Sequence, residues 1–218
     1  MPDLFASDLA AIPPPPLAER LRPLSLADVV GQEHLTGPDG ALGRMVAQRM
    51  LASIILWGPP GTGKTSIARL LADAVGLRFA PLSAVFSGVA DLKKVFADAD
   101  RLAASGQRTL LFVDEIHRFN RAQQDGFLPY VERGTVVLVG ATTENPSFAL
   151  NAALLSRAQV LVLHRLDEQA LTTLLERAEA ATGAALPLTA AARGALVASA
   201  DGDGRFCSTR WRRWSRRA

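Results

Sequence analysis

A glycine-rich stretch in the first third of the chain carries the residue types that can hold a phosphate chain. It reads Gly58-Pro59-Pro60-Gly61-Thr62-Gly63-Lys64-Thr65, with the spacing G-x-x-x-x-G-K-T. Glycines leave no Cβ in the way, so successive backbone N–H groups can point at the oxygens of a polyphosphate. The lysine supplies a cation for the β- and γ-phosphates, and the threonine hydroxyl is a ligand for Mg²⁺. The spacing therefore predicts a phosphate-binding loop, with Lys64 on the phosphates and Thr65 on the metal ion.

The segments on either side of this loop have the patterns that phosphate binding requires. Residues 53–57 form an apolar run that is typical of a buried parallel strand. Residues 65–75 repeat apolar side chains at helical spacing, and Gly76 offers a helix stop. The positive end of that helix faces the phosphates, so Ser66 in its first turn is assigned to the binding loop as well.

Two adjacent acids, Asp114 and Glu115, follow the apolar run at residues 109–113. An apolar strand that delivers acids at its carboxyl end suits a Mg²⁺–nucleotide site. Asp114 is expected to complete the Mg²⁺ shell, and Glu115 is expected to polarise the attacking water as a base. The second carboxylate favours a hydrolase over a simple binder. His117 is interpreted as structural, because a lone histidine more often is.

The polar residues that follow two later apolar runs leave their roles open. After residues 136–140, Thr143 and its neighbours could hold the lytic water against a γ-phosphate. Their hydroxyls could instead cap the turn that begins at Asn145. Arg157 precedes the run 159–163 and is either a surface charge or an arginine finger for a neighbouring subunit's γ-phosphate. Composition does not choose between these readings.

A short apolar piece near the N-terminus is a candidate for contact with the base of a nucleotide. Val29 and Val30 stand just before Gly31. They could pack against a flat adenine ring while backbone groups read its edge, or they could belong to a strap that packs on the core. Spacing alone does not separate the two, and both can hold.

Apolar strands alternate with helices along most of the chain. Strands are expected at 53–57, 78–82, 109–113, 136–140 and 159–163, and helices at 41–50, 65–75 and 89–105. This alternation predicts an α/β fold with a parallel sheet between helices. Helical spacing returns over 171–178 and 190–200, which predicts the start of a small helical lid domain. The expected divisions are a leader at 1–16, a nucleotide-binding αβα domain at 17–163, a partial lid at 164–206 and a tail at 207–218.

Composition describes an ordinary globular protein. The 218 residues are 49% hydrophobic and 21% charged, with a net charge of +3. Residues 207–218 hold five arginines and no acid, so the remainder of the chain carries a net charge of −2. No apolar run is long enough to span a bilayer, and the N-terminus lacks the basic start of a signal peptide. One cysteine excludes an internal disulfide and a cysteine-based metal site, and a cytoplasmic location is expected.

Several segments together resemble a known family. Arg22-Pro23 and residues 30–35, 56–65 and 113–125 resemble the AAA+ ATPases of the clamp-loader group. Residues 140–148 and 154–158 are similar to the replication-associated recombination protein A family within that group. The resemblance covers roughly residues 17 to 205.

The resemblance implies an ATPase that uses ATP and Mg²⁺ and acts on DNA at stalled or gapped replication forks, with replication proteins as candidate partners. It makes Gly58–Thr65 the Walker A motif and Asp114-Glu115 the Walker B motif. It makes Thr143 the sensor 1 residue, Arg157 the arginine finger that acts in trans, and Arg205 the sensor 2 residue. Members of the family hydrolyse ATP at subunit junctions, and a C-terminal region joins them into homotetramers. The resemblance also implies that the loop at 83–88 faces a central DNA channel, although an ordinary connection is the competing interpretation.

The last twelve residues depart from the family pattern, with five Arg and two Trp among them. One interpretation is a basic aromatic tail for nucleic acid. The favoured hypothesis is a frameshift product, because a GC-rich codon choice for this segment, shifted by two bases, spells an acidic amphipathic helix. The chain then lacks the family's assembly region, so binding of nucleotide is expected to be weakened and hydrolysis slow.

Two alternatives to a fork-maintenance ATPase follow from the same residues. The first is a clamp-loader subunit or a Holliday-junction branch-migration motor, which shares the predicted sheet and the placement of Arg157. Residues 145–148 speak against it. The second is a non-catalytic nucleotide-binding fragment. Turnover that Glu115→Gln leaves unchanged and near zero favours the second.

Overall fold

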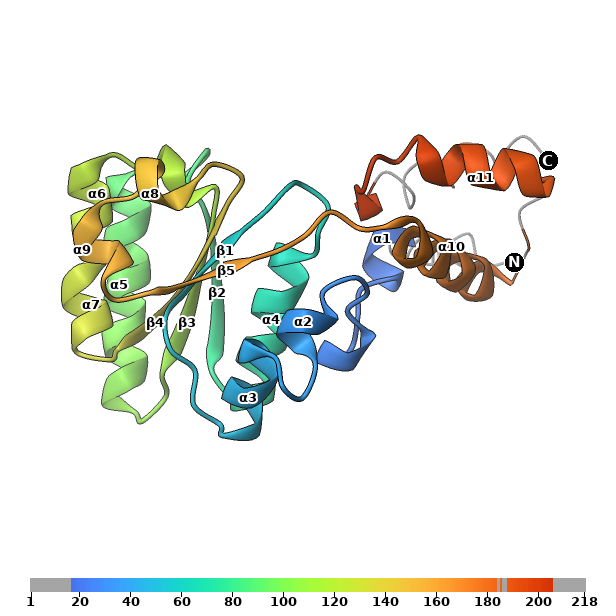
Figure 1. Ribbon diagram of the computed structural model, residues 1–218. Coiled ribbons are helices and arrows are strands. Elements are labelled where there is room, and N and C mark those ends of the chain that lie inside the picture. Colours follow the sequence, from blue (N-terminus) through green and yellow to red (C-terminus); the bar gives the residue numbers. More distant parts are fainter. Residues whose placement is uncertain (1–16, 184, 186–187, 206–218) are drawn as a thin grey trace, which may run out of the picture.

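The computed structural model describes residues 17–183, 185 and 188–205. Five strands form one sheet in the order β2-β3-β4-β1-β5, and every neighbouring pair is parallel (Figure 1). The strands are β1 Ile54–Trp57, β2 Arg78–Ser83, β3 Thr109–Asp114, β4 Val136–Thr142 and β5 Gln159–Val162. The predicted α/β fold with a parallel sheet is confirmed.

Helices cover both faces of the sheet (Figure 1). One face carries α2 Glu33–Thr36, α3 Ala41–Ala47 and α4 Lys64–Val75, and the other carries α5 Val89–Ala104, α6 Arg121–Asp125, α7 Leu128–Glu132, α8 Pro146–Ala149 and α9 Ala152–Leu155. Successive strand residues point to opposite faces, so Leu56 packs in the α4-side core while Ile55 packs in the α5-side core. Strands buried on both faces explain the continuous apolar runs in the sequence.

A third apolar cluster lies beside the sheet and is built by helices from both ends of the described chain. It joins α1 Leu17–Arg20 to α10 Glu168–Thr182 and α11 Ala190–Ala198. Leu175 is fully buried in it, and Leu17 is 3% exposed. The α10–α11 pair fits the predicted start of a helical lid. The domain boundaries at 163 and 206 remain predictions.

The short helices are the main difference between expectation and structure. The helices α2 and α6 to α9 are short and were not expected. Neither were two 3-10 turns, η1 at Leu26–Asp28 and η2 at Ile116–Arg118. Elements of three to five residues are shorter than two helical turns, so apolar periodicity cannot reveal them. Local caps hold several of them, such as the Asn120 side chain that accepts from the Gln123 N–H. The helix expected at 41–50 ends at Ala47, and Arg49 takes a left-handed φ of 52°.

Two of the expected segments cannot be compared with the structure. The leader at 1–16 and the arginine-rich tail at 207–218 lie outside the described residues. Among the described residues, none of the helices has the length and apolar character that a membrane span needs.

Candidate functional site: a nucleotide cavity at the carboxyl edge of the sheet

The phosphate-binding loop connects β1 to α4, as predicted. Gly61 and Gly63 have φ values of 74° and 95°, in the left-handed region that favours glycine. A Cβ on Gly61 would lie 1.8 Å from Asp203 Oδ1, and one on Gly58 would lie 2.5 Å from the Leu163 carbonyl oxygen. Glycine therefore lets neighbouring backbone approach the loop from two sides.

Lys64 is buried at the start of α4, and its ammonium turns back onto the loop. Nζ donates to the carbonyl oxygens of Gly58 and Pro59, at 2.7 Å each. Burial lowers the pKa of Lys64 below its usual value, while the nearby carboxylates of Glu115 and Asp114 oppose that shift. The ammonium is thus held against the loop carbonyls, within the electrostatic influence of the acidic pair.

The acidic pair lies where β3 ends. Asp114 is the last residue of that strand, and both carboxylates are half-buried. Glu115 adopts the left-handed region, with φ 53° and ψ 45°, and its carbonyl oxygen accepts from the Arg118 N–H at 2.8 Å. The Thr143 hydroxyl lies 3.5 Å from Glu115 Oε2. The structure therefore brings the predicted base and the predicted sensor threonine together at the carboxyl edge.

His117 is buried among oxygen atoms of the same edge. Its side chain is 3% exposed. Nδ1 lies 2.9 Å from Thr142 Oγ1 and 3.2 Å from Glu115 Oε2, and Nε2 lies 3.3 Å from Glu144 Oε1. The burial agrees with a structural histidine, but the partners belong to the site.

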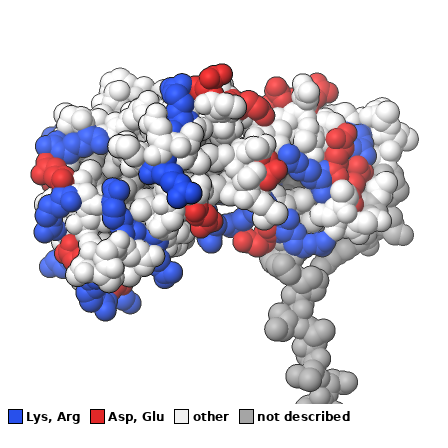
Figure 2. Space-filling view, turned by 90° about the horizontal axis from the view of Figure 1, so that it is seen from below, with Lys and Arg blue, Asp and Glu red and all other residues white. Residues whose placement is uncertain are grey.

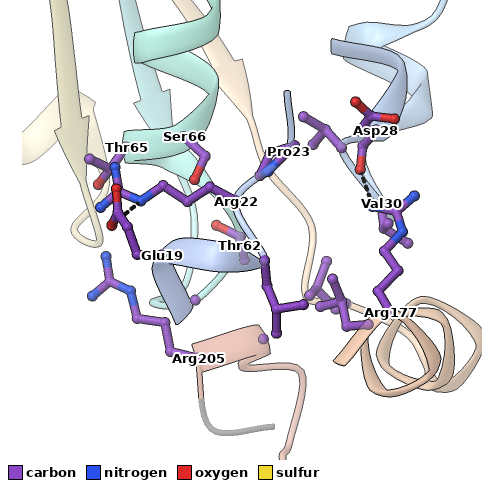
Figure 3. A pocket seen from close by; sticks show the side chains of 17 residues that line it. Glu19, Arg22, Pro23, Asp28, Val30, Thr62, Thr65, Ser66, Arg177 and Arg205 are labelled. Atoms are coloured by element: carbon purple, nitrogen blue, oxygen red, sulfur yellow. Dashed lines mark hydrogen bonds and ion pairs between the residues drawn. The ribbon is translucent and has the colours of Figure 1, made fainter. Parts of the chain in front are cut away.

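A cavity of about 300 Å³ lies beside the loop (Figure 3). Its loop side is formed by Gly61, Thr62, Gly63, Thr65 and Ser66. Its apolar side is formed by Pro23, Val29, Val30, Leu166 and Leu174. The two valines predicted to meet a base therefore line the cavity, and they also pack on the core, as the strap interpretation expects. Contact with a base stays a prediction. Gly58, Pro59 and Pro60 are not in the lining.

Two of the arginines that line the cavity, Arg22 and Arg177, were not predicted as site residues from the sequence. Arg22 Nε pairs with Glu19 Oε2 at 2.8 Å, while its Nη1 is buried without a hydrogen-bond partner among the described residues. In Figure 3 this side chain extends across the cavity toward Thr65. Arg177 Nη1 donates to the Asp28 carbonyl oxygen at 2.5 Å and ties α10 to the N-terminal segment. Arg22 belongs to the Arg22-Pro23 pair on which the family resemblance rests, so the sequence held a signal for it. No sequence feature pointed to Arg177.

The two remaining predicted arginines lie in different places. Arg205 lines the cavity, and its charge acts on Lys64. Arg157 instead precedes β5, whose first residue pairs with the first residue of β1, so it lies at the edge opposite the loop. There Arg157 Nη2 pairs with Glu132 at 2.6 Å. Within one chain, Arg157 does not reach the cavity.

The residues present fit a magnesium nucleotide. The buried Nη1 of Arg22 lacks an acceptor that an anionic or polar ligand supplies, and Gly61 and Gly63 take left-handed φ values that glycine adopts without strain. Mg²⁺ is held by a few hard oxygens together with phosphate, and Thr65 and Asp114 offer oxygens of that kind.

Sequence comparison places the chain among AAA proteins. The family described as "ATPase family associated with various cellular activities (AAA)" matches residues 54–166. The chain is 51% identical over 197 residues to replication-associated recombination protein A of Coxiella burnetii, covering 88% of this chain and 44% of that protein. It is 50% identical over 165 residues to the Escherichia coli K12 protein of the same name, covering 74% and 37%. The chain thus spans less than half the length of these relatives.

Comparison with solved structures also finds proteins of this fold. The Thermotoga maritima Holliday-junction branch-migration motor RuvB matches with a TM-score of 0.69 and 27% identity, covering 87% of this chain and 63% of that chain. Its K64R mutant matches with a TM-score of 0.70. The matched family segment begins at β1 and runs to Leu166, so it contains the loop, the acidic pair and Thr143. The chain belongs to the AAA family of ATPases.

Proposed function

We propose that this chain binds ATP with Mg²⁺ and hydrolyses it in the service of DNA replication and recombination. The observation that carries the proposal is one juxtaposition. A glycine loop with a buried lysine faces an adjacent Asp-Glu pair across the carboxyl edge of a parallel sheet. Ligands of open α/β sheets bind at this edge.

The described residues divide into a base side and a phosphate side. Val29, Val30, Leu166 and Leu174 offer apolar surface to a nucleobase. Backbone N–H groups of residues 61–66 and the start of α4 suit the phosphates. Lys64 supplies positive charge, and Thr65 with Asp114 supplies hard oxygens for Mg²⁺, which when bound neutralises charge on the phosphates.

Hydrolysis needs a base near the terminal phosphate, and Glu115 fits that role. Its carboxylate lies beside the Thr143 hydroxyl, so a water between the two can be oriented and can give up its proton to Glu115. Arg205, on the lid side of the cavity, adds positive charge over the phosphates. These roles remain proposals for the named residues.

A second copy of the chain is proposed to complete the site through Arg157. An arginine finger is worth roughly 10³–10⁵ in rate, so a subunit without a neighbour hydrolyses slowly. To act in trans, Arg157 must leave Glu132, a pair whose side chains are 38% and 50% exposed. Exposed ion pairs contribute only about 0–1 kcal/mol, so breaking the Arg157–Glu132 pair costs little free energy.

The charge of the two sheet edges supports such head-to-tail contact. Arg78 begins β2, Arg108 directly precedes β3 and Arg133 precedes β4, so these arginines lie at the amino edge with Arg157. Figure 2 looks onto that underside, where Lys and Arg gather toward the part of the molecule with α5 and α7. The opposite edge carries the acids Asp114, Glu115 and Glu144 as well as the cations Arg118 and Arg121, so its acidic part is what complements these arginines.

DNA is proposed as the macromolecular partner, because the relatives are named for replication-associated recombination. The carboxyl edge offers suitable chemistry for single strands. Phe86 and Phe148 are 89% and 90% exposed in the segments that follow β2 and β4. Between them, after β3, Arg118 and Arg121 are exposed. Aromatic rings flanked by cations stack bases and hold phosphates without reading sequence.

Substitution of the proposed base tests the hydrolytic claim. Glu115→Gln removes the proton acceptor but keeps the shape, so we expect ATP to bind as before and phosphate release to fall by about 10²–10⁴-fold. Glu168→Gln, an exposed change on α10, is the matched control. Phosphate release and ATP binding are measured on all three chains. Equal rates near zero in wild type and Glu115→Gln would favour a non-catalytic nucleotide-binding module.

The structural likeness to RuvB keeps a branch-migration motor as the second candidate. Stimulation of ATP turnover by different DNA structures separates the two. A four-way junction that stimulates far more than gapped or forked DNA favours the motor, and the reverse order favours the fork-maintenance ATPase.

A further inference from the structure

We propose that His117 is a positioning residue for hydrolysis: its ring holds the Glu115 carboxylate and links it to Glu144 on the neighbouring strand end. The inference rests on the proposed function, since it assigns Glu115 the role of base. It gives a task to a buried polar side chain that the roles above do not use.

A glycine on β4 allows His117 to lie beside Thr142 and Glu115 at the carboxyl edge. Gly140 has no Cβ, and one built there would lie 3.0 Å from Ile116 Cδ1 and 2.8 Å from Ile55 Cδ1. Ile116 is fully buried, so it anchors the η2 turn against β4. The next residue, His117, is thereby set beside Thr142, two positions further along the same strand.

Both ring nitrogens face oxygens of the site: Nδ1 hydrogen-bonds Thr142 Oγ1 and lies at ion-pair distance from Glu115, and Nε2 lies at ion-pair distance from Glu144. A carboxylate can only accept hydrogen bonds, so a ring nitrogen that bonds Glu115 or Glu144 does so as the donor. Nδ1 is 3.2 Å from Glu115 Oε2, and Nε2 is 3.3 Å from Glu144 Oε1. Thr142 Oγ1, 2.9 Å from Nδ1, also accepts from the Glu144 N–H at 3.0 Å. The hydroxyl therefore fixes the ring and the start of the Glu144 segment together.

Glu115 needs such a partner more than most glutamates do. Its left-handed backbone, with φ 53°, costs roughly 1–2 kcal/mol for a residue with a Cβ. Strain of this kind persists where surrounding contacts over-determine the conformation, and it is common at active sites. The Thr143 hydroxyl at 3.5 Å is at the limit of a hydrogen bond and holds the carboxylate weakly. The ring of His117 is the nearer partner.

Glu144 is the solvent-exposed member of the Glu115–His117–Glu144 group. Its side chain is 58% exposed, whereas that of His117 is 3% exposed. The following α8 turn presents Phe148 at 90% exposure. A change in the Glu144 carboxylate therefore alters the hydrogen bonding of a buried ring whose other nitrogen contacts the base.

Two conservative variants separate positioning from packing. His117→Asn keeps a side-chain N–H near the Nδ1 position, toward Glu115, and loses the one toward Glu144. His117→Gln keeps an N–H near the Nε2 position and loses the one toward Glu115. We expect kcat to fall about 100-fold in His117→Gln and only a few-fold in His117→Asn, with KM and ATP affinity within about twofold of wild type. Glu144→Gln is expected to lower kcat a few-fold.

A spectroscopic arm reads the contacts without turnover. The chain has three histidines, and the exposed pair His34 and His164 are internal controls. In long-range ¹H–¹⁵N spectra of the imidazoles, we expect Glu115→Gln to shift Nδ1 of His117 and Glu144→Gln to shift Nε2, with His34 and His164 unmoved. This arm decides the contact even where turnover is too slow to measure.

The outcomes distinguish this inference from the proposed function. Normal turnover in His117→Gln with normal ATP binding overturns the positioning role, and so do His117 resonances that ignore Glu115→Gln. Equal losses in the Asn and Gln variants with a matching loss of melting temperature indicate packing alone and also overturn it. Failure of the wild-type chain to bind ATP contradicts the proposed function, while the spectra still decide whether His117 holds Glu115.

Discussion

The two sides of the nucleotide cavity are built in different ways. The phosphate side is one continuous segment, residues 61–66, formed by the loop after β1 and the first turn of α4. The base side is assembled from residues 21–30 and 166–177, which are far apart in the chain. A continuous loop depends on local conformation, while an assembled wall depends on the packing of α10 against the N-terminal segment. Substitutions on the first side should therefore affect binding more than those on the second.

The loop conformation is the most sensitive point of the phosphate side. Gly61→Ala puts a Cβ at φ 74°, 2.9 Å from Asp203 Cα, so both the loop and the lid segment must shift. A combined cost near 3 kcal/mol corresponds to about a 100-fold loss of ATP affinity, measured by calorimetry. The control is Gly194→Ala in α11, whose Cβ meets nothing within 4 Å. It should leave binding unchanged and raise stability by roughly 0.5–1 kcal/mol.

Removal of Mg²⁺ is expected to cause the next largest loss of ATP affinity. We expect chelation of Mg²⁺ to weaken ATP binding about tenfold, because Thr65 and Asp114 then face phosphate without the cation between them. Asp114→Asn should make affinity nearly independent of Mg²⁺, and Asp73→Asn at the far end of α4 should not. Titrations with and without Mg²⁺ check this. An Asp114→Asn chain that keeps the full Mg²⁺ effect contradicts the assignment.

The base side should respond less, with a loss of ATP affinity and little change in stability. Arg22→Ala removes a buried Nη1 that has no partner among the described residues. A buried unsatisfied donor costs about 1–3 kcal/mol, so its loss offsets part of the lost packing and the free protein should keep its melting temperature. ATP affinity should fall a few-fold, while Arg101→Ala, exposed on α5, changes neither quantity. A melting temperature that falls together with affinity would show that Arg22 is mainly structural.

The sequence predicts well what is local and repetitive. Each strand was expected from its apolar run, and all begin and end within two residues of expectation. The loop and acidic pair follow from spacing that chemistry demands. These features depend on side chains near one another in the chain, so a single sequence contains the signal.

The features that the sequence does not predict come from packing between distant residues. The pair Arg157–Glu132 and the bond from Arg177 to the Asp28 carbonyl join positions 25 and 149 residues apart. His117 gives no signal either, because its partners Thr142 and Glu144 arrive only when η2 packs on Gly140. Such contacts appear once the fold is known.

The central claim is that Lys64 and Thr65 grip a triphosphate and its magnesium opposite Asp114 and Glu115. Calorimetric titration of the purified chain with ATP and Mg²⁺, beside Lys64→Ala, tests it most directly. We predict one binding site in the wild-type chain and a loss of about 100-fold or more in the variant, because a charge-assisted contact to phosphate disappears. Wild-type protein that takes up no ATP, or a variant that binds as tightly as wild type, contradicts the account.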